Sequence, residues 1–204
     1  MVEMGKIFSA MYENNGFLGS ESLSGPGSSV SRTAALRVEL PKVLQAFGIR
    51  RMVDAPCGDM NWMRYLEYGF DLFIGVDVVP EVIGRLRETV GSEAIQFQVG
   101  DICSDILPIA DAIFCRDCLV HLPFADITRA VRMFKRSGAT FLITTTYPDR
   151  DNRDIAVGEW RPLNLEATPL SWPAPIKLIR EDPTDDSNPW DHHKSLGVWV
   201  LAAL

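Results

Sequence analysis

The sequence has little of what several protein classes require. No apolar run of its 204 residues approaches the roughly 20 residues of a membrane-spanning helix. Residues 1–10 lack the basic segment and apolar block of a secretory signal. These absences predict a cytoplasmic protein with no membrane partner. In that compartment the four cysteines are expected to be reduced thiols.

Basic residues and metal ligands are also scarce. The chain has 20 Lys and Arg against 27 Asp and Glu, which gives a net charge of −7. A protein with this charge is poorly suited to bind the phosphate backbone of a nucleic acid. Three His and four Cys offer few metal ligands. We therefore expect no nucleic-acid partner and no metal. With 47% hydrophobic and 23% charged residues, the composition is that of a soluble globular protein, and the length suits one domain.

Apolar runs alternate with helical segments from residue 51 onward. Runs rich in Val, Ile, Leu, Phe and Ala occupy 51–55, 71–76, 94–99, 110–116 and 139–146, and segments of helical character occupy 60–68, 80–90 and 125–136. This alternation predicts a doubly wound α/β fold, with helices on both faces of a parallel sheet. Two further runs, 176–180 and 195–201, have no helical pattern between them and are expected to pair antiparallel.

The segments outside this core are less regular. Residues 19–29 are rich in Gly and Ser and predict a loop, and 33–47 have helical spacing that Pro41 could disturb. Residues 147–175 contain several prolines and no periodicity, which indicates a surface loop or a substrate-side insertion. We expect a single domain with an N-terminal arm (1–48), a core (49–146), this insertion and a C-terminal strand pair (176–204).

Carboxylates end three successive predicted strands, at Asp54, Asp77 and Asp101. Ligands of open α/β sheets bind beyond the carboxyl ends of the strands. Gly58, in the turn after the first strand, allows close approach of the backbone. Asp77 follows that turn by roughly 20 residues, where an acidic side chain can accept ribose hydroxyls. One such Asp is as often a turn or cap residue, but three on one rim indicate a nucleoside-containing ligand.

The pattern Asp54-x-x-Cys57-Gly58, then Asp77, then Gly100-Asp101 resembles the class I S-adenosylmethionine-dependent methyltransferases over about residues 50–146. The resemblance implies a Rossmann-like, mostly parallel sheet with an antiparallel C-terminal strand, and S-adenosylmethionine as cofactor. Pro56 and Met60 stand where the family often has glycine. The cofactor-binding residues that the resemblance implies are Asp54, Ala55, Pro56, Gly58, Trp62, Asp77, Val78, Asp101, Ile102 and Arg116.

The N-terminal arm is expected to cover this cofactor. Its Gly/Ser-rich lead-in and the helix over 33–47 would form a lid that excludes water from the sulfonium. Ser24, Gly25 and Arg37 are the expected contacts of this lid.

The segment after the fourth strand faces the transferable methyl group in this fold, so Asp117 and His121 are the candidate catalytic residues. An alcohol must lose its proton as it attacks, which calls for a base with a pKa near the working pH. His121 has a suitable intrinsic pKa, and Asp117 could orient it or act as the base itself. The alternative for His121 is capping or packing under the following helix.

Cys115 and Cys118 could be a redox pair or half of a zinc site. An offset of three along an extended chain points the two side chains to opposite faces. Packing or pocket lining is therefore the favoured interpretation.

The acceptor is expected to contact the insertion and the C-terminal strands. Aromatic rings beside hydrogen-bonding side chains suit a hydroxyl-rich ligand. The run Trp160-Arg161-Pro162-Leu163-Asn164-Leu165-Glu166 is similar to one in bacterial methyltransferases, some suspected to act on glycans, although Trp160 could equally pin the loop. The candidate acceptor-binding residues are Tyr147, Arg153, Trp160, Arg161, Asn164, His192 and Lys194.

The predicted function is methyl transfer from S-adenosylmethionine to a small polar molecule, at a hydroxyl oxygen of a saccharide-like or other compound. A sensor that binds S-adenosylmethionine or a nucleoside without catalysis is one alternative. A nicotinamide-dependent oxidoreductase is another, disfavoured because the G-x-G-x-x-G fingerprint is missing. No oligomeric state is predicted.

Overall fold

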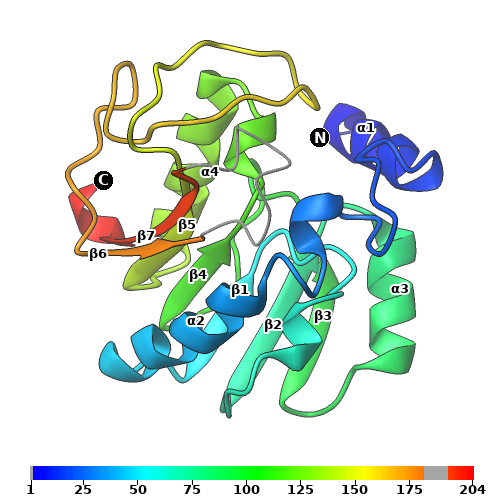
Figure 1. Ribbon diagram of the computed structural model, residues 1–204. Helices are drawn as coiled ribbons and strands as arrows, with labels where there is room; N and C mark the ends of the chain where they lie inside the picture. Colours follow the sequence, from blue (N-terminus) through cyan, green and yellow to red (C-terminus); the bar gives the residue numbers. More distant parts are fainter. Residues whose placement is uncertain (1, 182–192) are drawn as a thin grey trace.

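The computed structural model describes residues 2–181 and 193–204, which contain one seven-stranded sheet of order β3-β2-β1-β4-β5-β7-β6 (Figure 1). Strands β1 to β5 are parallel, and β7 runs antiparallel to both β5 and β6. The α/β prediction and the antiparallel C-terminal pair are confirmed. The strands are β1 Arg51–Asp54, β2 Leu72–Asp77, β3 Ile95–Val99, β4 Ala112–Cys115, β5 Phe141–Thr146, β6 Lys177–Arg180 and β7 Ser195–Val200.

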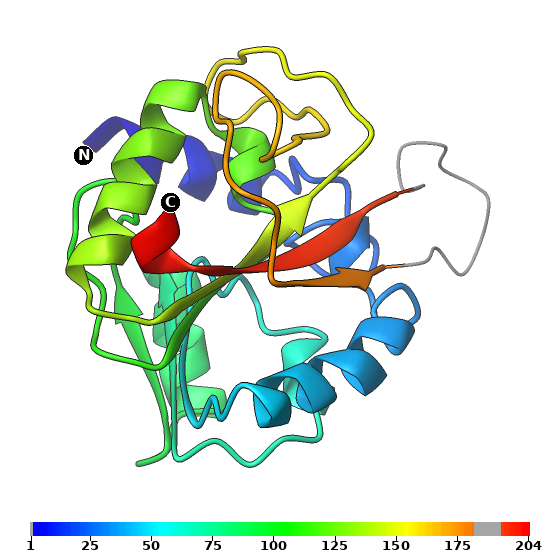
Figure 2. The same ribbon diagram turned by 90° about the vertical axis from the view of Figure 1, so that its left-hand side faces the viewer.

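Helices cover both faces of the sheet. Figure 2 shows α4 on one side of it and α2 on the other. The helices are α1 Val2–Glu13, α2 Ala34–Ala46, α3 Pro80–Thr89 and α4 Phe124–Arg136, with short 3-10 turns at Pro26–Ser28, Met63–Tyr65, Leu119–His121 and Leu201–Ala203. No helix among the described residues is long and apolar enough to cross a membrane.

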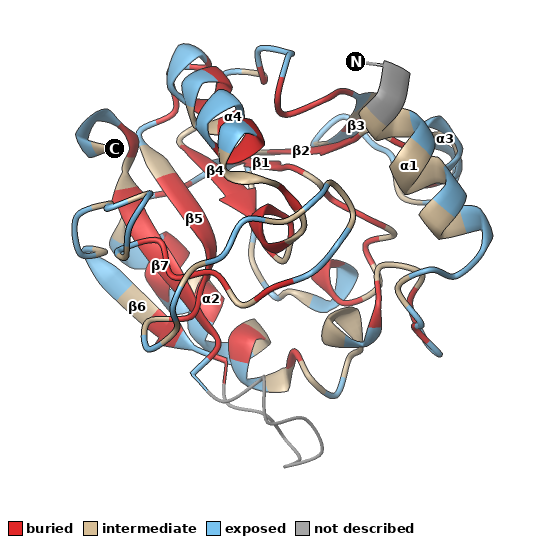
Figure 3. Cartoon of the chain, turned by 90° about the horizontal axis from the view of Figure 1, so that it is seen from above, coloured by how far each residue is buried: buried red, intermediate tan, exposed pale blue. Residues whose placement is uncertain are grey.

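Side chains of each central strand alternate between two hydrophobic cores. Val53 of β1 packs in the core that contains Ile127 of α4. Its neighbour Met52 packs in the opposite core, with Leu40 of α2 and Ile83 of α3. Successive strand residues point to opposite faces, so a strand covered on both sides is apolar throughout. The central strands are accordingly buried (Figure 3), which explains why their sequences predicted them well.

The segment 60–68 is not the helix that its sequence predicted. Only the 3-10 turn Met63–Tyr65 forms there. Met60 has a φ of 58°, in the left-handed region, so the chain turns tightly where an α-helix would have begun. The buried side chains of Trp62 and Met63 anchor this loop against the α2 side of the sheet.

Helix α2 forms as predicted, through Pro41, but it is not a lid. Leu36, Leu40 and Leu44 are fully buried in the core under the sheet. Arg37 donates to the carbonyl of Val30 and does not line the cavity described below. Helix α1, for which no prediction was made, covers the site instead.

Candidate active site

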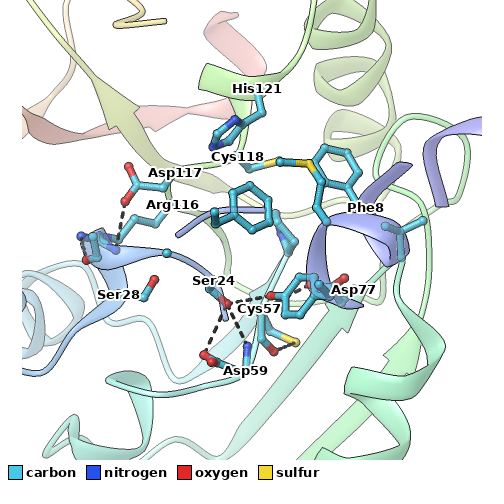
Figure 4. A pocket seen from close by; sticks show the side chains of 18 of the residues that line it. Phe8, Ser24, Ser28, Cys57, Asp59, Asp77, Arg116, Asp117, Cys118 and His121 are labelled. Atoms are coloured by element: carbon cyan, nitrogen blue, oxygen red, sulfur yellow. Dashed lines mark hydrogen bonds and ion pairs between the residues drawn. The ribbon is translucent and has the colours of Figure 1, made fainter. Parts of the chain in front are cut away.

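A cavity of about 410 Å³ opens at the carboxyl ends of the parallel strands. Cavities that bind small molecules span about 300–1,000 Å³. The cavity is lined by α1, by residues 24–28, by the turns after β1 to β4, and by Tyr147, Trp160 and Lys194. The α/β topology therefore brings the predicted rim of carboxylates, Asp54, Asp77 and Asp101, into one hollow. Figure 4 shows Asp77 among the residues that line it.

Asp54, the last residue of β1, lines this cavity and is only 4% exposed. Its carboxylate makes no hydrogen bond or ion pair within residues 2–181 and 193–204. Burial and the charge of Asp77 raise its pKa well above the ordinary value, against the opposing charge of Arg116. A buried carboxylate without a partner is available to a ligand that brings a donor or a positive charge.

Asp77, at the end of β2, is held by backbone amides. Its Oδ2 accepts from the Gly58 N–H at 3.0 Å and its Oδ1 from the Val79 N–H at 3.0 Å. Burial raises the pKa of Asp77 to about 6 although these bonds lower it. Gly58 has a φ of 55°, and a Cβ there would lie 2.3 Å from Ser24 Oγ. Only glycine fits this turn, which confines the backbone and the Asp77 carboxylate to the cavity rim.

The N-terminal arm is tied to the turn after β1 by Ser22, Ser24 and Asp59. Ser24 Oγ accepts from the Asp59 N–H at 3.1 Å and lies 2.7 Å from Tyr12 Oη of α1. Ser22 Oγ and the Leu23 N–H both donate to the Asp59 carboxylate at 2.9 Å. These bonds, part of which are dashed in Figure 4, hold α1 across the mouth of the cavity.

One face of α1 supplies cavity lining that the sequence analysis missed. It consists of Met4, Phe8, Met11 and Tyr12. The intervals of four, three and one residue are those of a single helical face, so the pattern was present in the sequence. Phe17, just after α1, also lines the cavity.

A buried ion cluster follows β4. Arg116 Nη2 lies 2.6 Å from Glu181 Oε2 and donates to the Gly27 carbonyl at 2.9 Å. Asp117 Oδ2 lies 3.1 Å from Arg116 Nη1 and 2.6 Å from Lys194 Nζ. Burial favours protonated Asp117, but Arg116 and Lys194 overcome it and hold the pKa of this carboxyl well below its usual range. Asp117 is thus an ionised carboxylate that Arg116 and Lys194 hold through Oδ2, while its side chain stays 25% exposed in the cavity. Its role as a base or as the group that orients His121 stays a prediction.

His121 is oriented by the backbone of the insertion. Its Nδ1 lies 3.0 Å from the carbonyl oxygen of Glu159. A carbonyl can only accept, so Nδ1 carries the proton and Nε2 keeps its lone pair in the neutral ring. Burial lowers the pKa of His121, against the opposing effects of the Glu159 bond and the Asp117 charge. The imidazole is neutral near pH 7, and it lies on the same side of the cavity as Cys118 and Asp117 (Figure 4).

Most of the predicted cofactor residues line the cavity, together with Ser24 and Gly25 of the arm. Ala55 is the exception, since it is fully buried in the core and its N–H donates to Phe114. Asp101 also caps its own turn, because Oδ1 accepts from the Cys103 N–H at 2.8 Å. The predicted residues that line the cavity are Asp54, Pro56, Gly58, Trp62, Asp77, Val78, Asp101, Ile102 and Arg116.

Arg161 lies outside the cavity, contrary to its predicted role in binding the acceptor. It is fully buried, and its guanidinium donates to the carbonyls of Leu119 at 3.0 Å, Leu122 at 2.8 Å and Arg153 at 3.2 Å. Burial lowers its pKa to about 10, which still leaves it charged at neutral pH. Arg161 therefore fastens the insertion to the turn that carries His121.

Two more of the predicted acceptor residues lie away from the cavity, and a third is not described. Asn164 donates to the Pro148 carbonyl within the insertion, and Arg153 has an exposed side chain. His192 lies outside the described residues. Tyr147, Trp160 and Lys194 do line the cavity. Sequence reasoning identified polar and aromatic residues of the insertion but not the direction in which each side chain points.

All four cysteines are buried free thiols. Cys115 and Cys118 pack in the same core on the α4 side, and Cys118 also lines the cavity, which agrees with packing or pocket lining. The expectation that the two side chains point to opposite faces is wrong, because the chain leaves the extended strand after Cys115 and brings the two thiols together. Within the described part of the chain, no group of three or more His, Cys, Asp or Glu side chains is arranged to hold a metal ion.

Comparison with known proteins bears on this site. The sequence model of a family described as "Methyltransferase domain" matches residues 53–140, which run from the last two residues of β1 through α4 and include the carboxylate rim. This part of the chain is therefore similar to methyltransferase domains.

The relatives found by sequence are distant. An arsenite methyltransferase from Halobacterium salinarum is 28% identical over 153 residues, which are 64% of this chain and 38% of that protein. The chain thus spans well under half the length of this curated relative.

Solved structures share the fold. The methyltransferase domain of the bacterial protein CtHen1-C aligns with a TM-score of 0.62 at 15% identity, over 83% of this chain and 98% of that one. Human N-acetylserotonin methyltransferase, solved in complex with S-adenosylmethionine, aligns with a TM-score of 0.53 at 18% identity, over 78% of this chain and 49% of that one.

The residues of the cavity fit S-adenosylmethionine, the cofactor predicted from the sequence. The turn at Gly58 leaves no room for a Cβ and brings the backbone to the rim, as the close approach of a ligand requires. Asp77 is positioned for hydroxyl groups, and the Asp54 carboxylate, which has no hydrogen-bond partner in the described part of the chain, suits a cationic ligand. The chemistry of the donor set thus agrees with a nucleoside that carries positive charge.

Proposed function

We propose that the protein transfers a methyl group from S-adenosylmethionine to a hydroxyl oxygen of a small molecule. The observation that supports this most directly is the hydrogen bond from His121 Nδ1 to the Glu159 carbonyl, which leaves Nε2 as a proton acceptor beside the cavity. The bound cofactor supplies an electrophilic methyl group on a sulfonium.

Different residues of the chain bind the cofactor, accept the proton and exclude water. Asp77, Asp54 and the backbone at Gly58 hold the nucleoside side. His121 takes the hydroxyl proton at Nε2, and the Glu159 carbonyl keeps the ring oriented and stabilises the imidazolium that results. The ionised Asp117 adds a negative charge that also favours this imidazolium. Helix α1 covers the cavity and limits the access of water.

The acceptor side of this proposal comprises Tyr147, Trp160 and Lys194, with His121 as base. A saccharide-like acceptor and another small hydroxyl compound are both compatible with a base at this position. A sensor that only binds the cofactor would need no such base, so the two functions are distinguished by whether a methyl group is transferred.

Binding is tested by calorimetric titration with S-adenosylmethionine, S-adenosylhomocysteine and a nicotinamide dinucleotide. We expect the first two to bind, and Asp77→Ala to weaken both by about 100-fold, because about 3 kcal/mol of hydrogen bonds to a charged group is lost. Asp71→Ala is the matched control, since Asp71 is exposed and pairs only with Arg50 among the described residues. Preference for the nicotinamide compound, or indifference to Asp77→Ala, would refute the proposal.

Catalysis is tested with methyl-labelled S-adenosylmethionine and a protein-free extract of small molecules. The wild type should label an extract component, and His121→Ala should reduce the rate by about 100-fold or more while the cofactor affinity stays within twofold. Cofactor binding without any labelled product would instead identify a sensor.

A further inference from the structure

The acceptor side of the cavity is lined differently from the cofactor side. Around His121 the lining is mainly aromatic and aliphatic, whereas the nucleoside side has the carboxylates of β1 and β2. We propose that the acceptor is a flat, apolar ring that carries the reacting hydroxyl, rather than a polyol. This inference rests on the proposed methyl transfer. The apolar lining residues on this side are Phe8, Phe17, Leu122, Tyr147 and Trp160.

The aromatic rings come from two separate parts of the chain. Phe17 lies edge-on to the His121 ring, 5.3 Å between centroids, and Phe8 stacks on Phe17 at 6.4 Å. From the insertion, Tyr147 and Trp160 form a second edge-on pair at 6.2 Å. Aromatic surfaces of this kind favour a planar apolar guest, which gains contact area and ring–ring attraction.

Helix α1 and the insertion also close over this side. The Gly158 N–H donates to the His121 carbonyl at 3.0 Å. A Cβ on Gly158 would lie 3.2 Å from Ile7 Cγ2 and 3.5 Å from Met11 Sδ, so α1 and the insertion are in contact there. An acceptor beside His121 is therefore largely removed from water.

The polar side chains near His121 are already engaged. Asp117 and Lys194 bond each other, and Arg161 is occupied by three backbone carbonyls. A polyol would bury several hydroxyls here without partners, which is unfavourable. A ring with a single hydroxyl needs one acceptor atom, and His121 Nε2 is that atom.

The chemistry also suits a ring hydroxyl. The hydroxyl oxygen donates an electron pair to the methyl carbon, the carbon–sulfur bond breaks with its pair left on sulfur, and the proton passes to His121 Nε2. A phenolic hydroxyl, with a pKa near 10, gives up its proton to an imidazole far more readily than an aliphatic alcohol does.

The experiment measures binding of 7-hydroxycoumarin and of methyl glucoside to the protein saturated with S-adenosylhomocysteine, by calorimetry. We expect the ring compound to bind at least about tenfold more tightly than the sugar. Phe17→Ala should weaken binding of the ring by about tenfold, and Phe17→Leu, which keeps apolar volume, by less. Leu18→Ala is the matched control, because Leu18 is 82% exposed and does not line the cavity.

Three results would overturn the inference: equal or tighter binding of methyl glucoside, ring binding that Phe17→Ala leaves unchanged, or no ring binding by a protein that binds S-adenosylhomocysteine. Affinity for S-adenosylhomocysteine in every variant reports whether the fold is intact. If the wild type does not bind S-adenosylhomocysteine, the proposed function itself is refuted, and this inference with it.

Discussion

His121 illustrates how one backbone contact sets the chemistry of a side chain. The carbonyl of Glu159 fixes the Nδ1–H form of the ring, and burial keeps the ring neutral. A histidine in the other tautomer would point a donor, not an acceptor, at a substrate hydroxyl. The sequence suggested Asp117 as the orienting group, but that carboxylate is taken by Arg116 and Lys194.

The titration of His121 gives a direct prediction. Its pKa in the folded protein should lie below 6.5, with Nδ1 protonated in the neutral form, as read from imidazole nitrogen shifts in an NMR titration. His121→Gln assigns the signal among the three histidines of the chain. The unfolded chain binds more protons than the folded one just below pH 6.5, so the contribution of His121 to stability is present above that pH and is lost as pH falls through the folded pKa. A pKa above 6.5, or an Nε2–H tautomer, would contradict the assigned role.

The insertion 147–175 positions His121 without any helix or strand of its own. Arg161 joins it to the 3-10 turn Leu119–His121 by hydrogen bonds to carbonyls at both ends of that turn. The planar guanidinium can serve three carbonyls at once, which an ammonium on a flexible stem cannot do in the same geometry. The insertion is thus part of the site's framework.

Arg161→Lys should disturb the Glu159–His121 contact while leaving the cofactor side intact. We expect the His121 pKa and tautomer signals to change, the free energy of unfolding to fall by about 1–3 kcal/mol, and affinity for S-adenosylhomocysteine to stay within threefold. Arg153→Lys, at an exposed side chain of the same segment, is the control. An unchanged His121 signal in a destabilised Arg161→Lys protein would show that Arg161 supports the fold but not the base.

Strands were easier to predict than the elements that surround them. Strands β1, β2, β4 and β5 are largely buried and mostly apolar, so they were recognisable within a few residues. The edge strand β3 is only partly buried, and its Ile, Phe and Val residues identified it. The segment 60–68 has the composition of a helix, but the tertiary anchor at Trp62 and the left-handed Met60 decide its path. Helix α1 has a single apolar face that makes sense only over the cavity it covers.

The cofactor half and the acceptor half of the site also differ in how well the sequence predicted them. Topology alone brings strand ends together, so the carboxylate rim followed from the sequence. The acceptor half depends on the directions in which the side chains of Arg161, Asn164 and Lys194 point. Sequence periodicity does not predict these directions in segments that have no regular secondary structure. Two of these three side chains bind backbone carbonyls, and Lys194 enters the ion cluster.

The ion cluster joins distant parts of the whole chain. Arg116 follows β4, Glu181 follows β6, Lys194 precedes β7, and the Gly27 carbonyl belongs to the N-terminal arm. Each charge is compensated by its neighbours in a nearly dry environment. Removal of one partner leaves another charge buried and uncompensated, which is costly.

Glu181→Ala should therefore lower the free energy of unfolding by about 3–5 kcal/mol, measured by urea denaturation. Glu181 is 6% exposed and is bonded to Arg116. Asp71→Ala, which removes the exposed ion pair with Arg50, should cost less than about 1 kcal/mol. Equal effects of the two substitutions would mean that the cluster is as weak as a surface pair.

The position of this cluster also has a consequence for the order in which its parts are made during translation. The carboxylates of the cavity rim are present once residue 101 has been made. Arg116 and Asp117 then remain without Glu181 and Lys194, and β5 keeps an open edge, until residues 181–200 have been added. A nascent chain thus carries the strands of the carboxylate rim well before it can close the ion cluster.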